Sequence, residues 1–382
     1  MIDECHHALT KFIVKGLHPF STVEEPAFRE MTKKLCPRYN LPSRDTLSNQ
    51  LIPAWYNVEK ENLLEDLKDV KKAAITADGW TSLNQDHYLT VTLHYIKDGV
   101  VKGKVLQTKA VYQAQTGAAV AEEIGNILDH FKVRDKVVAA TVDNAGNMDV
   151  ALKRLNVQKI GCFAHTLNLA AQKIQKCQTV SNWVARVRAV VVWMKSSHMA
   201  KVVLREKQKL LNKPQHMLLL DVRTQWNSLY LMVERFSEQF PAIQAASMDP
   251  RLKKLSGKEK VVEKLDGEDF RKAEEFVKLM RVLYTSTLCV STDTNPTCGQ
   301  ILPILEKLEG TFMVQGEDSP FSRNIKEKIW TDLSTRYQDA EVLTFLEEAT
   351  ATDPRFKLKK DTDDIWDRLK AVAVNSPVEQ EV

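Results

Sequence analysis

The spacing of apolar residues changes twice along the chain. Within residues 1–72, apolar side chains such as Phe28 and Met31 recur at helical intervals, which predicts helices with one buried face. From residue 73, short runs of β-branched and aromatic residues, some alternating with polar ones, predict strands. Helical spacing returns at residue 167 and continues to the end. The pattern therefore predicts a sheet-containing region between two helical regions.

The middle region is predicted to contain both strands and helices. Strands are expected at residues 73–78, 87–96, 102–112, 136–143 and 159–166. Residues 97–99 (Lys-Asp-Gly) are typical of a hairpin turn, and Thr116 is placed to cap a helix over 116–131. A second helix is expected over 144–155, after the continuous apolar run at 136–143 that is typical of a central parallel strand. This order predicts a mixed α/β sheet covered by helices.

Two of the predicted strands end in a carboxylate. Asp78 closes the first strand and Asp143 closes the fourth. If these strands are parallel neighbours, their carboxyl ends meet where open α/β sheets place binding sites. Two bare carboxylates there would repel each other, and a hydrated Mg²⁺ would remove that conflict. The alternative is structural: Asp143 caps the following helix and Asp78 lies in a turn.

Composition is that of an ordinary globular protein. The 382 residues include 43% hydrophobic and 27% charged residues, and no apolar stretch approaches the roughly 20 residues that span a bilayer. The first residues do not read as a signal peptide, so we expect an intracellular protein without membrane contact. Six scattered cysteines without a Cys-x-x-Cys pair predict neither a disulfide framework nor zinc binding in this chain.

The net charge of +4 is unevenly distributed. One stretch carries a single acid, Glu206, among eight basic residues: Arg186, Arg188, Lys195, Lys201, Arg205, Lys207, Lys209 and Lys213. At 3.6 residues per turn, Lys201, Arg205 and Lys209 share one stripe of a helix, while Val202, Val203 and Leu210 are expected to pack inward. The stripe is either a solvated face or a surface that follows the phosphates of DNA.

Four groups of residues suggest a family. In chain order they are ITADGWTS (75–82), TVDNAGNM with IGCFAHTLNLA (141–148 and 160–170), LLDVRTQWNSLYLMVERF (219–236) and TDPRFK (352–357). In these motifs the chain resembles the hAT superfamily of transposases and their domesticated relatives, the zinc finger BED domain-containing proteins. The resemblance extends from about residue 40 to 360.

The resemblance implies a ribonuclease H-like core interrupted by a large helical insertion. Asp78 and Asp143 match the first two acids of the family's DDE metal triad, which makes them candidate catalytic residues and Mg²⁺ ligands. Cys162 and His165 match its Cys-x-x-His motif, and Trp226 matches the tryptophan of its Arg-Trp motif. We expect three regions: an N-terminal helical segment (1–72), the ribonuclease H-like core (73–180) and the helical insertion domain (181–382).

Each of these last three residues has a structural alternative. Cys162 and His165 are spaced like zinc ligands but lack a second pair, so His165 is expected to hydrogen-bond near the acids or to cap a helix beginning at Thr166. Trp226 is either a core side chain or a ring that stacks on a flipped base. All three are candidate DNA contacts, together with Lys201, Arg205 and Lys209.

Three departures from the family pattern bear on activity. Gln225 replaces the arginine of the Arg-Trp motif and cannot supply charge to a phosphate. The third acid of the triad is expected beyond Val382, close to the family's dimerisation region, and the N-terminal BED finger has no counterpart here. Glu347 or Glu348 could substitute for the third acid only from a different sequence context.

These departures favour a transposase-derived or truncated protein without catalysis. It would act in the nucleus as a module that binds DNA, chromatin or protein, including in transcription regulation, with low DNA sequence specificity. Protein partners or a homo-oligomer are expected only by analogy with the full-length family. The alternative is an active, metal-dependent DNA transposase or nuclease whose third acid comes from elsewhere.

Overall fold

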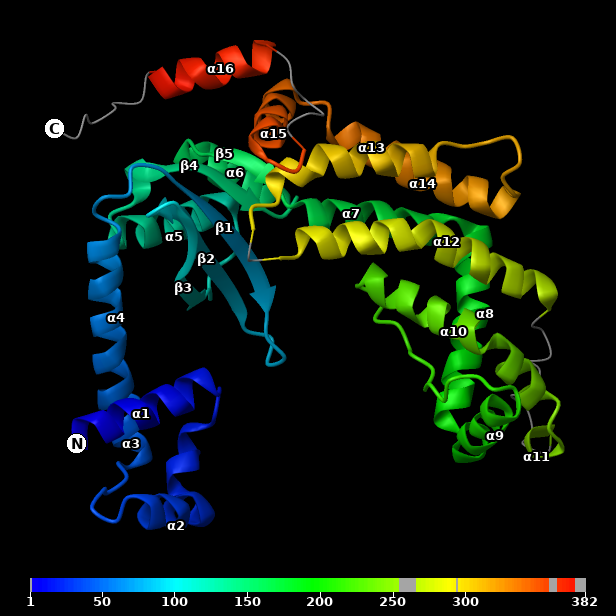
Figure 1. The fold of residues 1–382 in the computed structure, drawn as a ribbon, viewed down its shortest axis with the longest axis horizontal. Helices are drawn as coiled ribbons and strands as arrows, with labels where there is room; N and C mark the ends of the chain where they lie inside the picture. The colour runs from blue at the N-terminus through cyan, green and yellow to red at the C-terminus, as the bar shows by residue number, and fades with distance from the viewer. Residues whose placement is uncertain (1, 254–265, 293–294, 357–362, 375–382) are drawn as a thin grey trace.

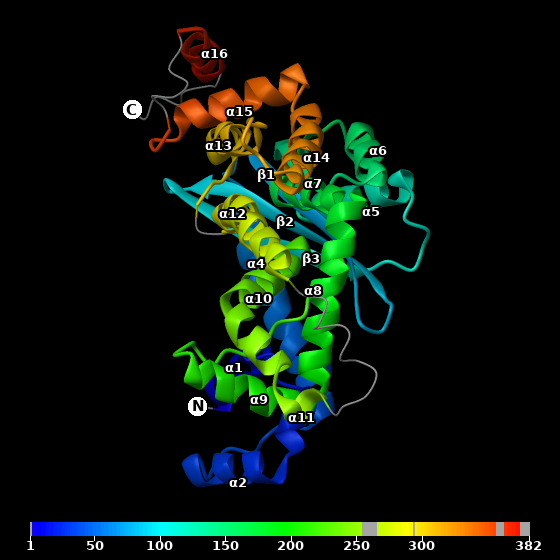
Figure 2. The ribbon, with the colours of Figure 1, turned by 90° about the vertical axis from the view of Figure 1, so that its right-hand side faces the viewer.

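The computed structural model describes residues 2–253, 266–292, 295–356 and 363–374; Lys357, which ends the fourth motif, lies outside these ranges. A sheet region lies between an N-terminal group of helices and a larger helical region (Figure 1). In the view turned by 90°, the helical region lies in front of the sheet (Figure 2).

The sheet contains five strands in the order β3-β2-β1-β4-β5. Their bounds are β1 (Ala73–Thr81), β2 (His87–Lys97), β3 (Val100–Ala110), β4 (Val137–Val142) and β5 (Gln158–Gly161). The first three pair antiparallel, whereas β4 lies parallel to both β1 and β5. The predicted mixed sheet with a central parallel strand is confirmed.

One face of the sheet packs on two helices, α5 (Gly117–His130) and α6 (Gly146–Leu155). Alternating residues of β1, such as Ile75 and Ala77, join Ile124 of α5 and Leu152 of α6 in one core. The predicted Thr116 cap is present, since its side chain accepts from the backbone N–H of Ala119 at 3.2 Å. The 97–99 hairpin turn is also confirmed, with positive φ angles at Asp98 (54°) and Gly99 (71°).

The N-terminal region has its own small core. Its elements are α1 (Ile2–Lys15), η1 (Phe20–Glu24), α2 (Pro26–Leu35), α3 (Arg44–Thr46), the π-helical turn η2 (Leu47–Leu51) and α4 (Ile52–Asp66). Leu9, Ile13 and Leu47 are buried together there. Lys97 of β2 donates to the Asp66 carboxylate at 2.9 Å, which ties the end of α4 to the sheet.

The helical region follows β5 and has one large core that contains Trp183, Phe236 and Phe276. Its helices are α7 (Phe163–Lys173), η4 (Ile174–Lys176), α8 (Gln178–Ser196), α9 (His198–Leu210), α10 (Trp226–Ser247), α11 (Pro250–Lys253), α12 (Gly267–Val290), η6 (Cys298–Gln300), α13 (Ile301–Phe312), α14 (Pro320–Arg336), α15 (Ala340–Thr352) and α16 (Asp363–Val374). The short helix η3 (Arg134–Lys136) precedes β4. Helix α8 leads away from the sheet, and α9, α10 and α11 gather near its far end (Figure 1).

Two local predictions are wrong. The strand expected over 159–166 ends at Gly161, because Phe163 begins α7 and buries its side chain, together with Leu167, in the helical core. Leu210, expected to pack inward, leaves 73% of its surface exposed at the C-terminal end of α9. Val203 of the same helix is buried, as expected.

Candidate functional site

Asp78 and Asp143 lie at matching positions of neighbouring parallel strands. The register pairs Ala77 of β1 with Val142 of β4, and each aspartate is the next residue along the chain. Ala77 and Val142 face the core under α5 and α6, so the aspartates, one residue further, are directed to the opposite face. The adjacency predicted from the two strand-then-acid patterns is confirmed by this register.

Side-chain hydrogen bonds fix the loop that carries Asp143. Its Oδ1 accepts from the backbone N–H of Ala145 at 3.0 Å, while Ala145 itself is the N-cap of α6. The alternative in which Asp143 caps that helix is therefore wrong. Asn144 donates from Nδ2 to Thr166 Oγ1 at 3.0 Å, which links this loop to the first turns of α7.

Gly161 provides the space that this link needs. A Cβ atom at residue 161 would lie 2.8 Å from Asn144 Oδ1, closer than real side chains approach. The backbone N–H of the next residue, Cys162, donates to the carbonyl of Val142 at 2.7 Å. The ends of β4 and β5 and the start of α7 are thus held as one unit beside the acids.

The acid pair is electrostatically coupled. The pKa of Asp78 is raised above its usual 3.8, first by partial desolvation and then by the negative charge of Asp143. The nearby imidazole of His165 and the backbone N–H of Gly79 oppose this increase in the pKa. Asp78 is nevertheless solvent-exposed, so an ion from solution can reach the pair.

Two stacked aromatic rings, an exposed one and a half-buried one, lie beyond Asp78 on β1 and β2. Trp80 stacks on Tyr88 with ring centroids 4.6 Å apart, and its indole N–H donates to Thr90 Oγ1 at 3.2 Å. Trp80 leaves 43% of its surface exposed. Sequence reasoning assigned no role to this pair, although the break at Gly79 followed by a tryptophan was the available signal.

The ligand types at the pair fit one hydrated Mg²⁺, which takes one or two carboxylates and keeps several waters. Within residues 2–253, 266–292, 295–356 and 363–374, no three His, Cys, Asp or Glu side chains are grouped so that they could hold a metal ion. Glu347 and Glu348 were the candidates to replace the third acid of the triad. Their carboxylates lie instead 3.6 and 3.1 Å from the guanidinium of Arg368. The described residues therefore fit a two-carboxylate site and not a three-acid one.

Cys162 and His165 lie at the start of α7. Cys162 is the N-cap residue of this helix, and its carbonyl accepts from Thr166 N at 2.9 Å and Thr166 Oγ1 at 3.1 Å. His165 therefore does not cap a helix beginning at Thr166, because α7 starts two residues before it. Its imidazole instead lies near the acids, as expected, and lowers the pKa of Asp78.

Trp226 is buried at the first position of α10. Only 3% of its surface is exposed, and it belongs to the same core as Leu229 and Val233. This placement agrees with the structural alternative, a core side chain, and leaves no exposed ring for stacking on a base. The neighbouring Gln225 is exposed and is the N-cap residue of α10.

The basic stretch divides into paired and unpaired cations. Arg188 of α8 donates from Nε and Nη2 to the two carboxylate oxygens of Asp221 at 2.7 and 2.5 Å. Arg186 contacts Asp269 at 2.5 Å, and Lys207 contacts Asp249 at 3.2 Å. Lys201, Arg205 and Lys209 are exposed along α9 and form no ion pair with any residue that the structure describes.

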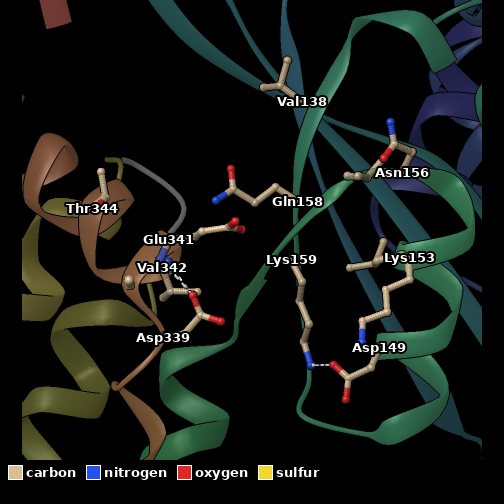
Figure 3. A pocket seen from close by; sticks show the side chains of 13 residues that line it. Val138, Asp149, Lys153, Asn156, Gln158, Lys159, Asp339, Glu341, Val342 and Thr344 are labelled. Carbon is tan, nitrogen blue, oxygen red and sulfur yellow. Dashed lines mark hydrogen bonds and ion pairs between the residues drawn. The ribbon is translucent and has the colours of Figure 1, made fainter. Parts of the chain in front are cut away.

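A large groove lies away from all these residues. It is an open groove of about 910 Å³ between α6, β5 and the first turns of α15 (Figure 3). Lys153 and Lys159 lie on one side and Asp339 and Glu341 on the other. Lys159 is paired with Asp149, and Asp339 caps α15 (Figure 3). The groove contains neither acid of the pair, so its size gives no reason to place the site there.

Comparison with known proteins gives two adjacent family matches. The family model described as the ZBED1 RNase-like domain matches residues 76–162, and that described as the ZBED1 RNase-like helical domain matches residues 160–266. The first range contains β2 to β5 and all but the first three residues of β1, and the second begins within β5. The ribonuclease H-like sheet with a helical insertion is confirmed.

Similar proteins carry matching names. Zinc finger BED domain-containing protein 4 of Homo sapiens is 24% identical over 379 residues, covering 95% of this chain and 31% of that protein. RICESLEEPER 2 of Oryza sativa subsp. japonica, another zinc finger BED domain-containing protein, is 24% identical over 373 residues, covering 92% and 49%. Putative AC transposase of Zea mays is 29% identical over 259 residues, covering 63% and 32%.

The chain thus spans about a third to a half of the length of these curated relatives. None of the helices in the described part is long and apolar enough to cross a membrane. The fold, the order of the motifs and the matches together show that the chain belongs to the hAT superfamily of transposase-derived proteins related to the zinc finger BED domain-containing proteins.

Proposed function

We propose that this chain is a nuclear DNA-binding module that has kept the transposase core without its chemistry. The observation that carries the proposal is the stripe of α9, formed by Lys201, Arg205 and Lys209. These three cations face solvent without an ion-pair partner among the described residues. Like charges four residues apart repel by a few tenths of a kcal/mol per pair, so the stripe is mildly unfavourable until an anion meets it. Duplex DNA supplies such anions at regular spacing.

The absence of cleavage is inferred from what surrounds the acid pair. Asp143 and His165 are the side chains that shift the pKa of Asp78, and neither Glu347 nor Glu348 is among them. Both glutamates are engaged with Arg368. Electrostatic preorganisation supplies most of the rate in such reactions, so two acids without a third carboxylate are expected to bind a cation without directing phosphoryl transfer.

Mg²⁺ remains a proposed ligand of the pair. Asp78 and Asp143 would hold it with water completing its coordination, and its charge would offset their mutual repulsion. The pair also supports the second candidate function, a metal-dependent nuclease or transposase, since two metal-bound acids are part of that chemistry. Activity would then require a further acid from outside the described residues.

Incubation of the purified chain with supercoiled plasmid in Mg²⁺ or Mn²⁺ separates the two candidates. We expect retarded plasmid without nicked or linear product. The matched control is Asp78→Asn, which changes one oxygen to nitrogen at an exposed position and should leave plasmid binding intact. Metal-dependent nicking that disappears in Asp78→Asn would establish the nuclease and overturn the inactive assignment.

A further inference from the structure

A small cavity opens beside the stripe of α9, between α8, α9 and residues 215–218. Its volume is about 40 Å³, enough for roughly three water-sized groups, and so for the two non-bridging oxygens of one phosphodiester. The basic side chains that line it are Lys195, Lys201, Arg205 and His216. No acidic side chain lines it. Lys209, although on the same stripe, lies outside the cavity.

Buried amides hold the outer wall of this cavity in place. Gln208 is 1% exposed and donates from Nε2 to the carbonyl of His216 and to Gln239 Oε1, both at 2.9 Å. Gln239, with no exposed surface, donates to the carbonyl of Pro214 at 3.0 Å. Lys195 donates to the carbonyl of Leu218 at 3.0 Å. The segment after α9 is therefore fixed against the helix by these hydrogen bonds.

The charge around the cavity is incompletely balanced. His216 faces Glu238, with its Nδ1 3.0 Å from both carboxylate oxygens, and Glu206 on the neighbouring face of α9 is paired with Arg251. These pairs leave three cations at the cavity without an acidic partner among the described residues: Lys195, which donates to the Leu218 carbonyl, and Lys201 and Arg205, which are exposed. Leu204 and Leu218 contribute apolar surface to the lining. Charge contacts are stronger beside such surface than in open water.

We propose that this cavity seats one backbone phosphate of duplex DNA, gripped by Lys201 and Arg205 from adjacent turns of α9. Lys195 adds positive potential behind it, while Lys209 meets the next stretch of backbone as an ordinary surface charge. The inference rests on the proposed function, because it takes the same stripe as the DNA contact. It adds that Lys201 and Arg205 hold one phosphate in a defined cavity, whereas Lys209 contacts DNA only as a surface charge.

Three single substitutions test this distinction: Lys201→Gln, Arg205→Gln and Lys209→Gln. Each removes one positive charge from an exposed position of α9, so thermal unfolding should be unchanged and serves as the folding control. Affinity for a fluorescent duplex is measured by anisotropy at several salt concentrations. We expect Lys201→Gln and Arg205→Gln each to weaken binding about tenfold or more, as for loss of a charge-assisted hydrogen bond. Lys209→Gln should weaken it by less than about threefold, as expected for a solvent-screened surface charge.

The outcomes separate the anchored phosphate from the stripe itself. Equal losses in all three variants would overturn the cavity as a phosphate seat but leave α9 as the DNA-binding surface. No loss in any variant would overturn both. Inorganic phosphate at constant ionic strength provides a second probe, since it should compete with DNA in the Lys209→Gln protein but not in Lys201→Gln. If phosphate competes equally in both variants, the cavity is not a phosphate-binding site.

Discussion

Helices α8 and α9 carry similar positive charge but use it in opposite ways. On α8, Arg188 forms a two-point contact with Asp221, whose side chain is 1% exposed, and Arg186 contacts Asp269, which is 3% exposed. On α9, Lys201, Arg205 and Lys209 point to solvent. Both acids that pair with α8 come from outside the basic stretch, 33 and 83 residues further along the chain. Arg186 and Arg188 are therefore tied to buried acids, whereas the stripe of α9 is available to a ligand.

The comparison shows that a basic stretch in a sequence is not one functional unit. An arginine next to a buried carboxylate contributes to folding, and its charge is largely cancelled at the surface. An unpaired lysine on an exposed face contributes little to folding and keeps its field. Substitutions on the two helices should accordingly affect different measurements, and the predictions below run from the largest expected effect to the smallest.

The largest effect is expected for Arg188→Met. It leaves the Asp221 carboxylate buried without its two-point partner and should lower the free energy of unfolding by about 3–5 kcal/mol. Urea unfolding followed by circular dichroism measures this loss. The double substitution Arg188→Met/Asp221→Leu removes both charges and should recover a large part of it. A loss below about 1 kcal/mol for Arg188→Met would show that the Arg188–Asp221 pair contributes no more than an ordinary surface ion pair.

A smaller effect of opposite sign is expected for Asp78→Asn. Because the folded state raises the pKa of Asp78, the protonated form is the favoured one, and its stabilising contribution is lost as the pH rises through that folded pKa. Replacement by asparagine should therefore increase the free energy of unfolding at pH 7. Solvent screening at this exposed position keeps the gain below about 1 kcal/mol.

The sign of that effect is checked by repeating the urea unfolding near pH 3.8, the usual pKa of an aspartate. Most Asp78 side chains in the folded protein are then protonated, so the advantage of asparagine should shrink. Asp143→Asn is the matched control at pH 7, since it removes the other half of the same repulsion. If both variants were less stable than the native chain at pH 7, the coupling of the two acids would be refuted.

The smallest effect on stability is expected for the triple substitution of Lys201, Arg205 and Lys209 by glutamine. These side chains make no ion pair with a described residue, and the change removes their mutual repulsion. The free energy of unfolding should stay constant or rise by a few tenths of a kcal/mol. A decrease of more than about 1 kcal/mol in urea unfolding would mean that α9 uses its cations for folding, as α8 does.

Elements with regular local signals were predictable from the sequence. The apolar run ending at Val142, the Thr116 cap and the turn at Asp98 and Gly99 each depend on neighbouring residues only. The matching positions of Asp78 and Asp143 followed from two copies of one pattern, an apolar run followed by an acid. The end of the first strand was predicted wrongly, because β1 continues past Asp78 to Thr81, so Asp78 lies neither at a strand end nor in a turn. The roles of both acids and the boundaries of the three regions stay predictions.

Features that depend on distant partners were not predictable. The strand expected to continue through Phe163 becomes helix because that ring packs into a core assembled largely from later helices. Arg186 and Arg188 resembled surface charges because Asp269 and Asp221 lie far away in the sequence. The order of apolar residues on α9 gave no sign that Leu210 would be left exposed at the end of the helix.

The most direct test of the account is the salt dependence of duplex binding for the native chain and the triple glutamine variant of α9. If the stripe contacts DNA, the variant should bind more weakly, and its slope of log affinity against log salt should be shallower by about 0.9 for each lost phosphate contact. The matched control removes three exposed lysines elsewhere in the helical region, Lys278, Lys307 and Lys328, and should bind almost like the native chain. Equal slopes for the native chain and the α9 variant, or an equal loss in the control, would contradict the assignment of α9 as the DNA-binding surface.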